Sequence, residues 1–249
     1  MENTLITFGC SFTEGVGCYD YTLGEISKYD SVNNTDKMGR FHAKNLNNFL
    51  LNGWPSKLQD SLCYDKLLNY GYGGSSNSYA IKRFVGNLYH KELKNSNVLV
   101  IWLLTFHHRF TYFYKGKLHT FTHGDPIHVE YNKLLDETDS RFESYHHVEV
   151  MKALCDSRGW NFLFASISDE EIDYLSTYPN FDKIKDNFIN TKIPVGVGNV
   201  DNSKKSKICT HPNELGYIDV SNTFYDWISK NKPEYVFNKN IINPIKIRC

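Results

Sequence analysis

The chain has 249 residues, enough for one α/β domain with a substantial buried core. Its 28 basic and 28 acidic residues give a formal net charge of zero, with no basic stripe. Because phosphate contacts need clustered Lys and Arg, we expect no nucleic-acid partner. No apolar stretch approaches the ~20 residues that cross a bilayer, and the N-terminus lacks a secretory signal pattern. We therefore expect a cytoplasmic protein without a membrane partner.

Apolar runs alternate with amphipathic stretches along the chain. The apolar runs predict buried parallel strands at Leu5–Gly9, Leu67–Tyr70, Val98–Leu103 and Asn161–Ala165. The amphipathic stretches predict helices at Phe41–Leu51, Pro55–Leu62, Ser78–Leu93, Ser140–Arg158, Asp169–Thr177 and Asn213–Ser229. This order predicts a three-layer α/β/α sandwich with a mainly parallel, flavodoxin-like sheet. We expect a single domain over residues 1–249, with a C-terminal tail from about residue 230.

Local signals refine this outline. Ser168, three residues before Glu171, predicts a capping box at the start of the fifth helix. Alternation around Lys115-Gly116 predicts a surface β-hairpin over Thr111–Phe121. The long polar stretch Cys18–Arg40 lacks periodicity, and we expect it to cover a functional site.

A serine follows the first predicted strand, in Gly9-Cys10-Ser11-Phe12-Thr13-Glu14-Gly15. A tight turn there presents the Ser11 hydroxyl at the carboxyl edge of the sheet, where open α/β folds build their sites. The structural alternative is a serine that caps the turn before a helix. We interpret Cys10 as a small buried side chain rather than a second nucleophile.

A histidine lies near the other end of the chain, in His211-Pro212-Asn213-Glu214-Leu215-Gly216. Its place directly before a helical stretch suits an imidazole that reaches over the sheet edge. Serine is a weak nucleophile at its free pKa and needs such a base. The alternative for His211 is an exposed loop histidine. The pairing with Ser11 favours a hydrolase.

Taken with the Gly73-Gly74-Ser75-Ser76-Asn77 turn after the second strand, these two motifs resemble the SGNH/GDSL hydrolase superfamily. The resemblance covers residues 5 to about 228. It implies an SGNH-hydrolase-like fold and an ester hydrolase that forms an acyl-enzyme on Ser11, with His211 as general base. It also implies a small-molecule or glycan ester as substrate, an acetylated carbohydrate above all.

The expected acid of a catalytic triad is missing. The family places an aspartate three residues before the histidine, where this chain has Ile208. Loss of that carboxylate costs up to ~10⁴ in rate in a serine protease triad. Three explanations stay open: another group such as a backbone carbonyl or Asp201 orients His211, the site is a Ser–His dyad, or catalysis has decayed.

The resemblance also suggests donors for the oxyanion. Gly74 would supply a backbone N–H, because glycine lets the backbone approach the reacting carbonyl closely. Asn77 would add its side-chain amide or cap the following helix, and we favour the cap. The family's third-block asparagine is absent, and Thr105 would take its donor role. Arg109, four residues later, would bind substrate or brace the loop.

Three histidine clusters invite a metal interpretation: His107-His108, His119/His123/His128 and His146-His147. No HExxH motif and no closely spaced cysteine pair accompanies them. We therefore expect no metal and no cofactor.

Two rival functions stay open. The first is a binding or structural module of the same fold with a degraded triad, favoured by the missing acid. The second is an O-acyltransferase, in which a sugar hydroxyl replaces water as the acceptor. Trapping by an organophosphonate separates the module from both enzymes, and acceptor dependence separates the two enzymes.

Overall fold

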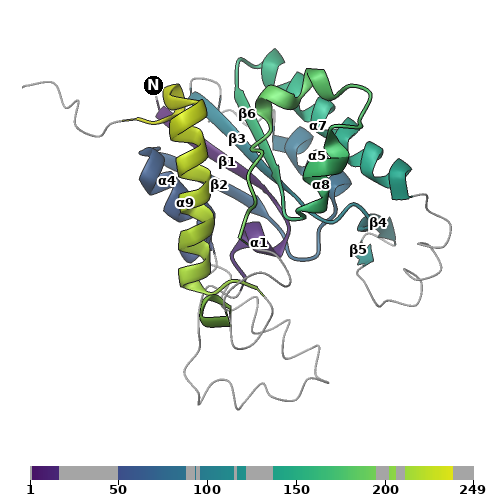
Figure 1. The fold of residues 1–249 in the computed structure, drawn as a ribbon, viewed down its shortest axis with the longest axis horizontal. Coiled ribbons are helices and arrows are strands. Elements are labelled where there is room, and N and C mark those ends of the chain that lie inside the picture. Colours follow the sequence, from purple (N-terminus) through teal and green to yellow (C-terminus); the bar gives the residue numbers. More distant parts are fainter. Residues whose placement is uncertain are drawn as a thin grey trace, which may run out of the picture.

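The computed structural model describes residues 2–16, 50–87, 93, 96–114, 117–121, 137–194, 202–205 and 211–237. Four parallel strands form the central sheet in the order β2-β1-β3-β6 (Figure 1). Their bounds are β1 Glu2–Gly9, β2 Lys66–Gly71, β3 Ser96–Leu104 and β6 Asn161–Ser166. All four predicted strands are confirmed.

The strands are apolar at successive positions because both faces of the sheet are covered. Side chains of a strand point alternately to the two faces. Leu99 and Ile101 of β3 therefore belong to one buried cluster, whereas Val100 and Trp102 belong to the other. Each of these four side chains is fully buried.

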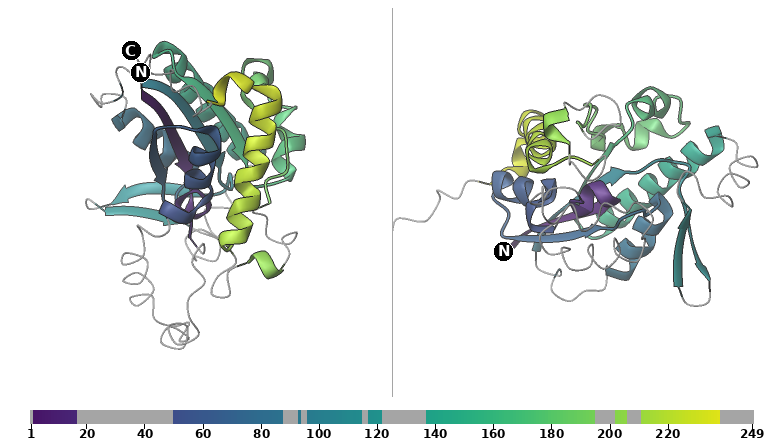
Figure 2. Two further views of the ribbon diagram at one scale, coloured as in Figure 1. Left: turned by 90° about the vertical axis from the view of Figure 1, so that its left-hand side faces the viewer. Right: turned by 90° about the horizontal axis from the view of Figure 1, so that it is seen from below.

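Helices form the two outer layers. The α-helices are α1 Ser11–Glu14, α4 Trp54–Leu62, α5 Asn77–Asn87, α7 Glu137–Ser157, α8 Glu170–Leu175 and α9 Glu214–Asn231. Short 3₁₀ turns are η2 Phe181–Lys183, η3 Lys185–Asn187, η4 Asn202–Lys204 and η5 Pro233–Tyr235. Helices α4 and α9 pack on one face, and α5 and α7 on the other (Figure 2). The three-layer α/β/α prediction is confirmed.

Most predicted helices appear within a few residues of their expected bounds. The predicted helix Phe41–Leu51 lies almost wholly outside the described residues, as does residue range 88–92 of the third. The capping box is wrong: Asp169 is the N-cap of α8 and makes no side-chain capping bond. The Glu171 side chain instead turns inward and pairs with His107.

The predicted hairpin is confirmed, with β4 Phe110–Tyr114 antiparallel to β5 Lys117–Phe121. It projects from the body of the molecule (Figure 2). The predicted covering loop 18–40 lies outside the described residues. None of the described helices combines the length and apolarity needed to span a membrane. The single-domain assignment and the tail from about residue 230 stay predictions.

Candidate active site

Ser11 begins α1, directly after the turn that ends β1. The turn depends on Gly9, whose φ is +153° and whose added Cβ would lie 2.1 Å from Thr13 Oγ1. Because no side chain fits there, only glycine allows α1 to fold back so tightly on the strand. The Ser11 side chain lies at the carboxyl edge of the sheet and is buried. Cys10 beside it is a buried free thiol within the core, as predicted.

His211 is held by the N-terminus of α9. Asn213 caps this helix by accepting from the Gly216 N–H at 3.1 Å, and its amide donates to the Ser203 carbonyl at 2.7 Å. An added Cβ on Gly216 would lie 2.5 Å from the Lys204 carbonyl oxygen. The Asn and Gly of the histidine motif thus serve to dock the 202–205 segment against the start of α9.

Two contacts join α9 to the Ser11 turn. The His211 ring packs on Phe12, with ring centroids 4.7 Å apart. The buried Tyr217 of α9 donates its hydroxyl to the Val16 carbonyl at 2.8 Å. As a result His211 Nε2 lies 2.7 Å from Ser11 Oγ, although the residues are 200 positions apart. The predicted convergence of these two side chains is confirmed.

The far side of the imidazole has no partner among the described residues. His211 Nδ1 is buried and forms no hydrogen bond within the described part of the chain. Asp201, a predicted substitute for the missing acid, and Ile208 lie outside the described residues. Burial, and then the charge of Arg109, lower the pKa of His211 from 6.5 to about 4. This buried ring is therefore neutral at pH 7.

The Gly73-Gly74 turn lies against the Ser11 turn. The Tyr72 N–H and the Ser75 hydroxyl both donate to the Gly9 carbonyl, at 3.1 Å and 3.0 Å. Gly74, between them, has a positive φ of 75°, which glycine adopts at little cost. The turn after β2 is thereby fixed beside the backbone that carries the nucleophile candidate.

Glu14 is a site residue that sequence reasoning missed. It is 2% exposed, and its carboxylate accepts from the Gly73 N–H at 2.7 Å. Burial raises its pKa to about 7, although the bond from Gly73 and the charge of Arg83 act to lower it. A glutamate in a four-residue helix gives little sequence signal for burial. Its place inside the serine motif is the only hint.

Asn77 does not cap α5. Its amide nitrogen donates to the Thr105 carbonyl and the Ser144 hydroxyl, both at 3.1 Å, and its oxygen accepts from the Thr105 N–H at 3.0 Å. The favoured capping role is therefore wrong, and the Ser76 hydroxyl accepts from the Tyr79 N–H instead. With both amide hydrogens engaged, Asn77 has no donor left for an oxyanion. It ties the turn after β2 to the loop after β3.

Thr105 makes no side-chain hydrogen bond to another described residue. Its side chain is 4% exposed, and Oγ1 is buried without a hydrogen-bond partner in the described part of the chain. Arg109, four residues later, stacks its guanidinium on the Phe106 ring, with Cζ 5.1 Å from the centroid. Thr105, the candidate oxyanion donor, and Arg109, the candidate substrate-binding residue, thus lie on the loop that follows β3, next to the end of β1.

His107 belongs to a buried charge cluster rather than to a metal site. His107 Nδ1 lies 3.0 Å from Glu171 Oε1, Arg141 Nη1 lies 3.3 Å from the same oxygen, and Tyr145 donates to the other oxygen. Burial acts to raise the pKa of Glu171, but these partners outweigh it and lower the pKa. Among the described residues no three His, Cys, Asp or Glu side chains gather as metal ligands.

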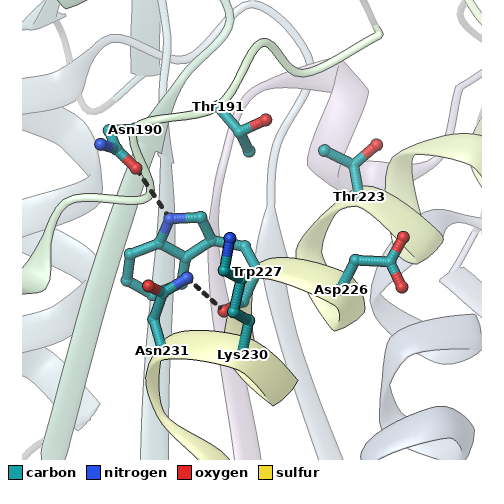
Figure 3. Close-up of a pocket in the computed structure, with 7 residues that line it drawn as sticks. All are labelled: Asn190, Thr191, Thr223, Asp226, Trp227, Lys230 and Asn231. Carbon is teal, nitrogen blue, oxygen red and sulfur yellow. Dashed lines mark hydrogen bonds between the residues drawn. The ribbon is translucent and has the colours of Figure 1, made fainter.

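A separate groove of about 600 Å³ lies farther along α9 (Figure 3). Trp227 at its centre donates to Asn190 Oδ1 at 2.8 Å. At 1.5 Å per helical residue, Trp227 lies roughly 20 Å beyond the helix start that holds His211. The groove is therefore distinct from the Ser11–His211 pair.

Comparison with solved structures identifies the fold. One similar structure is a protein from Desulfitobacterium hafniense DCB-2 assigned to the lipolytic G-D-S-L family, at 13% identity and TM-score 0.51, covering 91% of this chain and 99% of that chain. A psychrotrophic esterase from Pseudoalteromonas sp., in a structure inhibited by monoethylphosphonate, shows 13% identity and TM-score 0.45, covering 92% of this chain and 98% of that chain. No family model and no curated protein matches the sequence. The first likeness shows an SGNH/GDSL-like fold, as the motifs predict.

Proposed function

We propose that this chain is a serine ester hydrolase with Ser11 as nucleophile and His211 as general base. The observation that carries the proposal is the 2.7 Å separation of Ser11 Oγ and His211 Nε2. A nucleophile and its base must lie within about 2.6–3.2 Å. The pair lies at the carboxyl edge of a parallel sheet, where α/β folds bind their ligands. The SGNH/GDSL-like fold supports the same function.

Acylation follows from this geometry. Nε2 of neutral His211 takes the hydroxyl proton while Ser11 Oγ attacks the ester carbonyl. The tetrahedral intermediate collapses, and the imidazolium returns the proton to the departing alcohol. In deacylation His211 deprotonates a water that attacks the acyl group, and Ser11 recovers its proton. The products are one acid and one alcohol.

The oxyanion needs preorganised donors near Ser11. We assign this role to the backbone N–H groups of Ser11 and Gly74. The Thr105 hydroxyl is the third candidate, because it is buried and has no partner among the described residues. Asn77 positions the loop of Thr105 rather than contacting the substrate.

The site is a dyad in its described part, and this predicts slow turnover. For Nε2 to accept a proton, neutral His211 must carry its own proton on Nδ1, and no described group holds that tautomer. No carboxylate there offsets the imidazolium charge. The low pKa keeps the base neutral at pH 7 but makes it weak.

For the substrate we propose an acetylated carbohydrate. This choice rests on the family resemblance rather than on a residue of the site. Because His211 Nδ1 has no partner in the described part of the chain, one alternative is favoured, a binding module of the same fold that no longer turns over esters.

Hydrolysis of p-nitrophenyl acetate by the purified protein tests the proposal. Ser11→Ala should abolish turnover, and His211→Ala should lower it by orders of magnitude, because such residues act as a unit. Ser61→Ala, on the exposed side of α4, is the matched control and should leave the rate unchanged. An organophosphonate should phosphonylate Ser11 as its leaving group departs, so the wild type and Ser61→Ala should gain the mass of the phosphonyl group and Ser11→Ala should not. A wild type that neither turns over nor becomes labelled would support the binding module.

A further inference from the structure

Arg109 carries a charge that no described residue neutralises. Its Nη1 is buried and has no hydrogen-bond partner among the described residues, and no described Asp or Glu forms an ion pair with Arg109. The remainder of the side chain is partly exposed, with the guanidinium over the Phe106 ring. A ring face offsets only part of the charge of a desolvated cation.

The loop that carries this cation packs on the same core cluster as the Ser11 turn. Arg109 lies on the loop that follows β3, and β3 pairs with β1 from Glu2 to Phe8. Phe106 packs against the cluster that contains Phe12, and Phe12 stacks on His211. Burial lowers the pKa of His211, and the charge of Arg109 lowers it further.

The two buried carboxylates among the described residues are engaged elsewhere. Glu171 holds His107 and Arg141, and Glu14 accepts from the Gly73 N–H. A partly buried guanidinium without an anion is costly, because its desolvation is not repaid by a partner. Its fork of donors matches the two oxygens of a carboxylate. The missing partner is therefore best supplied by the ligand.

We propose that Arg109 binds a carboxylate carried by the ester substrate. The proposal rests on the proposed function and narrows its substrate class from esters in general to anionic esters. An O-acetylated acidic sugar combines this class with the carbohydrate substrate proposed above. Neutral lipids and simple alkyl acetates would bind without the ion pair.

Binding of a carboxylate at Arg109 also changes the base. The negative charge offsets the cation that acts on His211, so the pKa of the imidazole rises when the substrate is bound. The general base thus becomes stronger only in the complex with the anionic ester. A purely structural arginine would not produce this coupling.

Equilibrium binding to the Ser11→Ala protein tests the proposal without turnover. The probes are 3-acetoxybenzoate and its neutral methyl ester, compared by calorimetry. A charge-assisted contact should favour the anion by about 10-fold or more. The preference should vanish in Ser11→Ala/Arg109→Gln and weaken in Ser11→Ala/Arg109→Lys. Ser11→Ala/Arg158→Gln, which removes an exposed arginine after α7, should keep it.

The outcomes separate this inference from the proposed function. Equal affinity of the two probes, or an anion preference that survives Arg109→Gln, overturns the role of Arg109. Turnover of p-nitrophenyl acetate by the wild type decides the hydrolase proposal independently. In the wild type, the acid limb of the kcat profile should lie at higher pH for 3-acetoxybenzoate than for its methyl ester. Equal limbs would contradict the coupling to His211.

Discussion

Glu14→Gln should remove a large part of the pH dependence of stability. The wild-type carboxyl is buried under the Gly73-Gly74 turn, and its pKa is about 7 in the folded protein against an ordinary 4.5. The folded state therefore binds the proton more tightly than the unfolded chain. The stabilisation of the folded state by this proton is complete below pH 4.5 and is lost as the pH rises through 7. Glutamine keeps an oxygen for the Gly73 N–H but cannot ionise.

The size of the effect follows from the pKa difference. At 1.36 kcal/mol per pKa unit, Glu14 costs the wild type about 2.5 kcal/mol of stability between pH 5 and pH 8. In a domain of this size that corresponds to roughly 5–10 °C in Tm. His211 has the opposite sign: its lowered pKa removes stability as the pH falls from 6.5 to about 4. That slope is common to both proteins and cancels in their difference.

The assay is urea or thermal unfolding of wild type and Glu14→Gln at pH 5 and pH 8. The change in unfolding free energy from pH 5 to pH 8 should be less negative in the variant by about 2.5 kcal/mol. Glu2→Gln, at the exposed start of β1, is the control and should retain the wild-type pH dependence. Parallel pH curves for wild type and Glu14→Gln would refute the buried, proton-binding carboxyl.

Further predictions concern the site and the packing around it. The kcat/KM for p-nitrophenyl acetate should stay level from pH 5 to 8 and fall only near pH 4, where His211 becomes protonated; an acid limb near pH 6.5 would show an unperturbed ring. Gly71→Ala should destabilise by about 3 kcal/mol, because its Cβ would lie 2.3 Å from the Glu14 backbone nitrogen. Gly86→Ala, in α5 with nothing within 4 Å, should instead stabilise by about 0.5–1 kcal/mol in the same unfolding assay. Asn77→Ala should cost about 1–3 kcal/mol and lower kcat, since it leaves buried backbone groups of the β3 loop unpaired. Prolonged dialysis against EDTA should leave ester cleavage intact, and loss of activity would require a metal.

The sequence by itself determined the strands, the layer order and the two principal site residues, Ser11 and His211. These features depend on local patterns. A short apolar run bounded by turn signals indicates a buried strand without reference to the rest of the fold. The tight turn at Gly9 likewise needs glycine, because an added Cβ would contact Thr13, only four residues away. The pairing of Ser11 with His211 was predictable because each motif is a local signal and because the order of the motifs resembles that of the SGNH/GDSL hydrolases.

Only the tertiary structure decided what the polar side chains contact. Asn77 precedes a helix, which locally favours a cap, yet both of its amide ends bind Thr105, 28 residues away. Glu171 fits a capping box, but the fold offers it His107 and Arg141 instead. The proton affinity of Glu14 likewise arises from burial, and the low pKa of His211 arises from burial and then from the charge of Arg109 on the loop after β3. Propensity acts over one turn of chain, whereas desolvation and long-range hydrogen bonds exist only once the layers have packed.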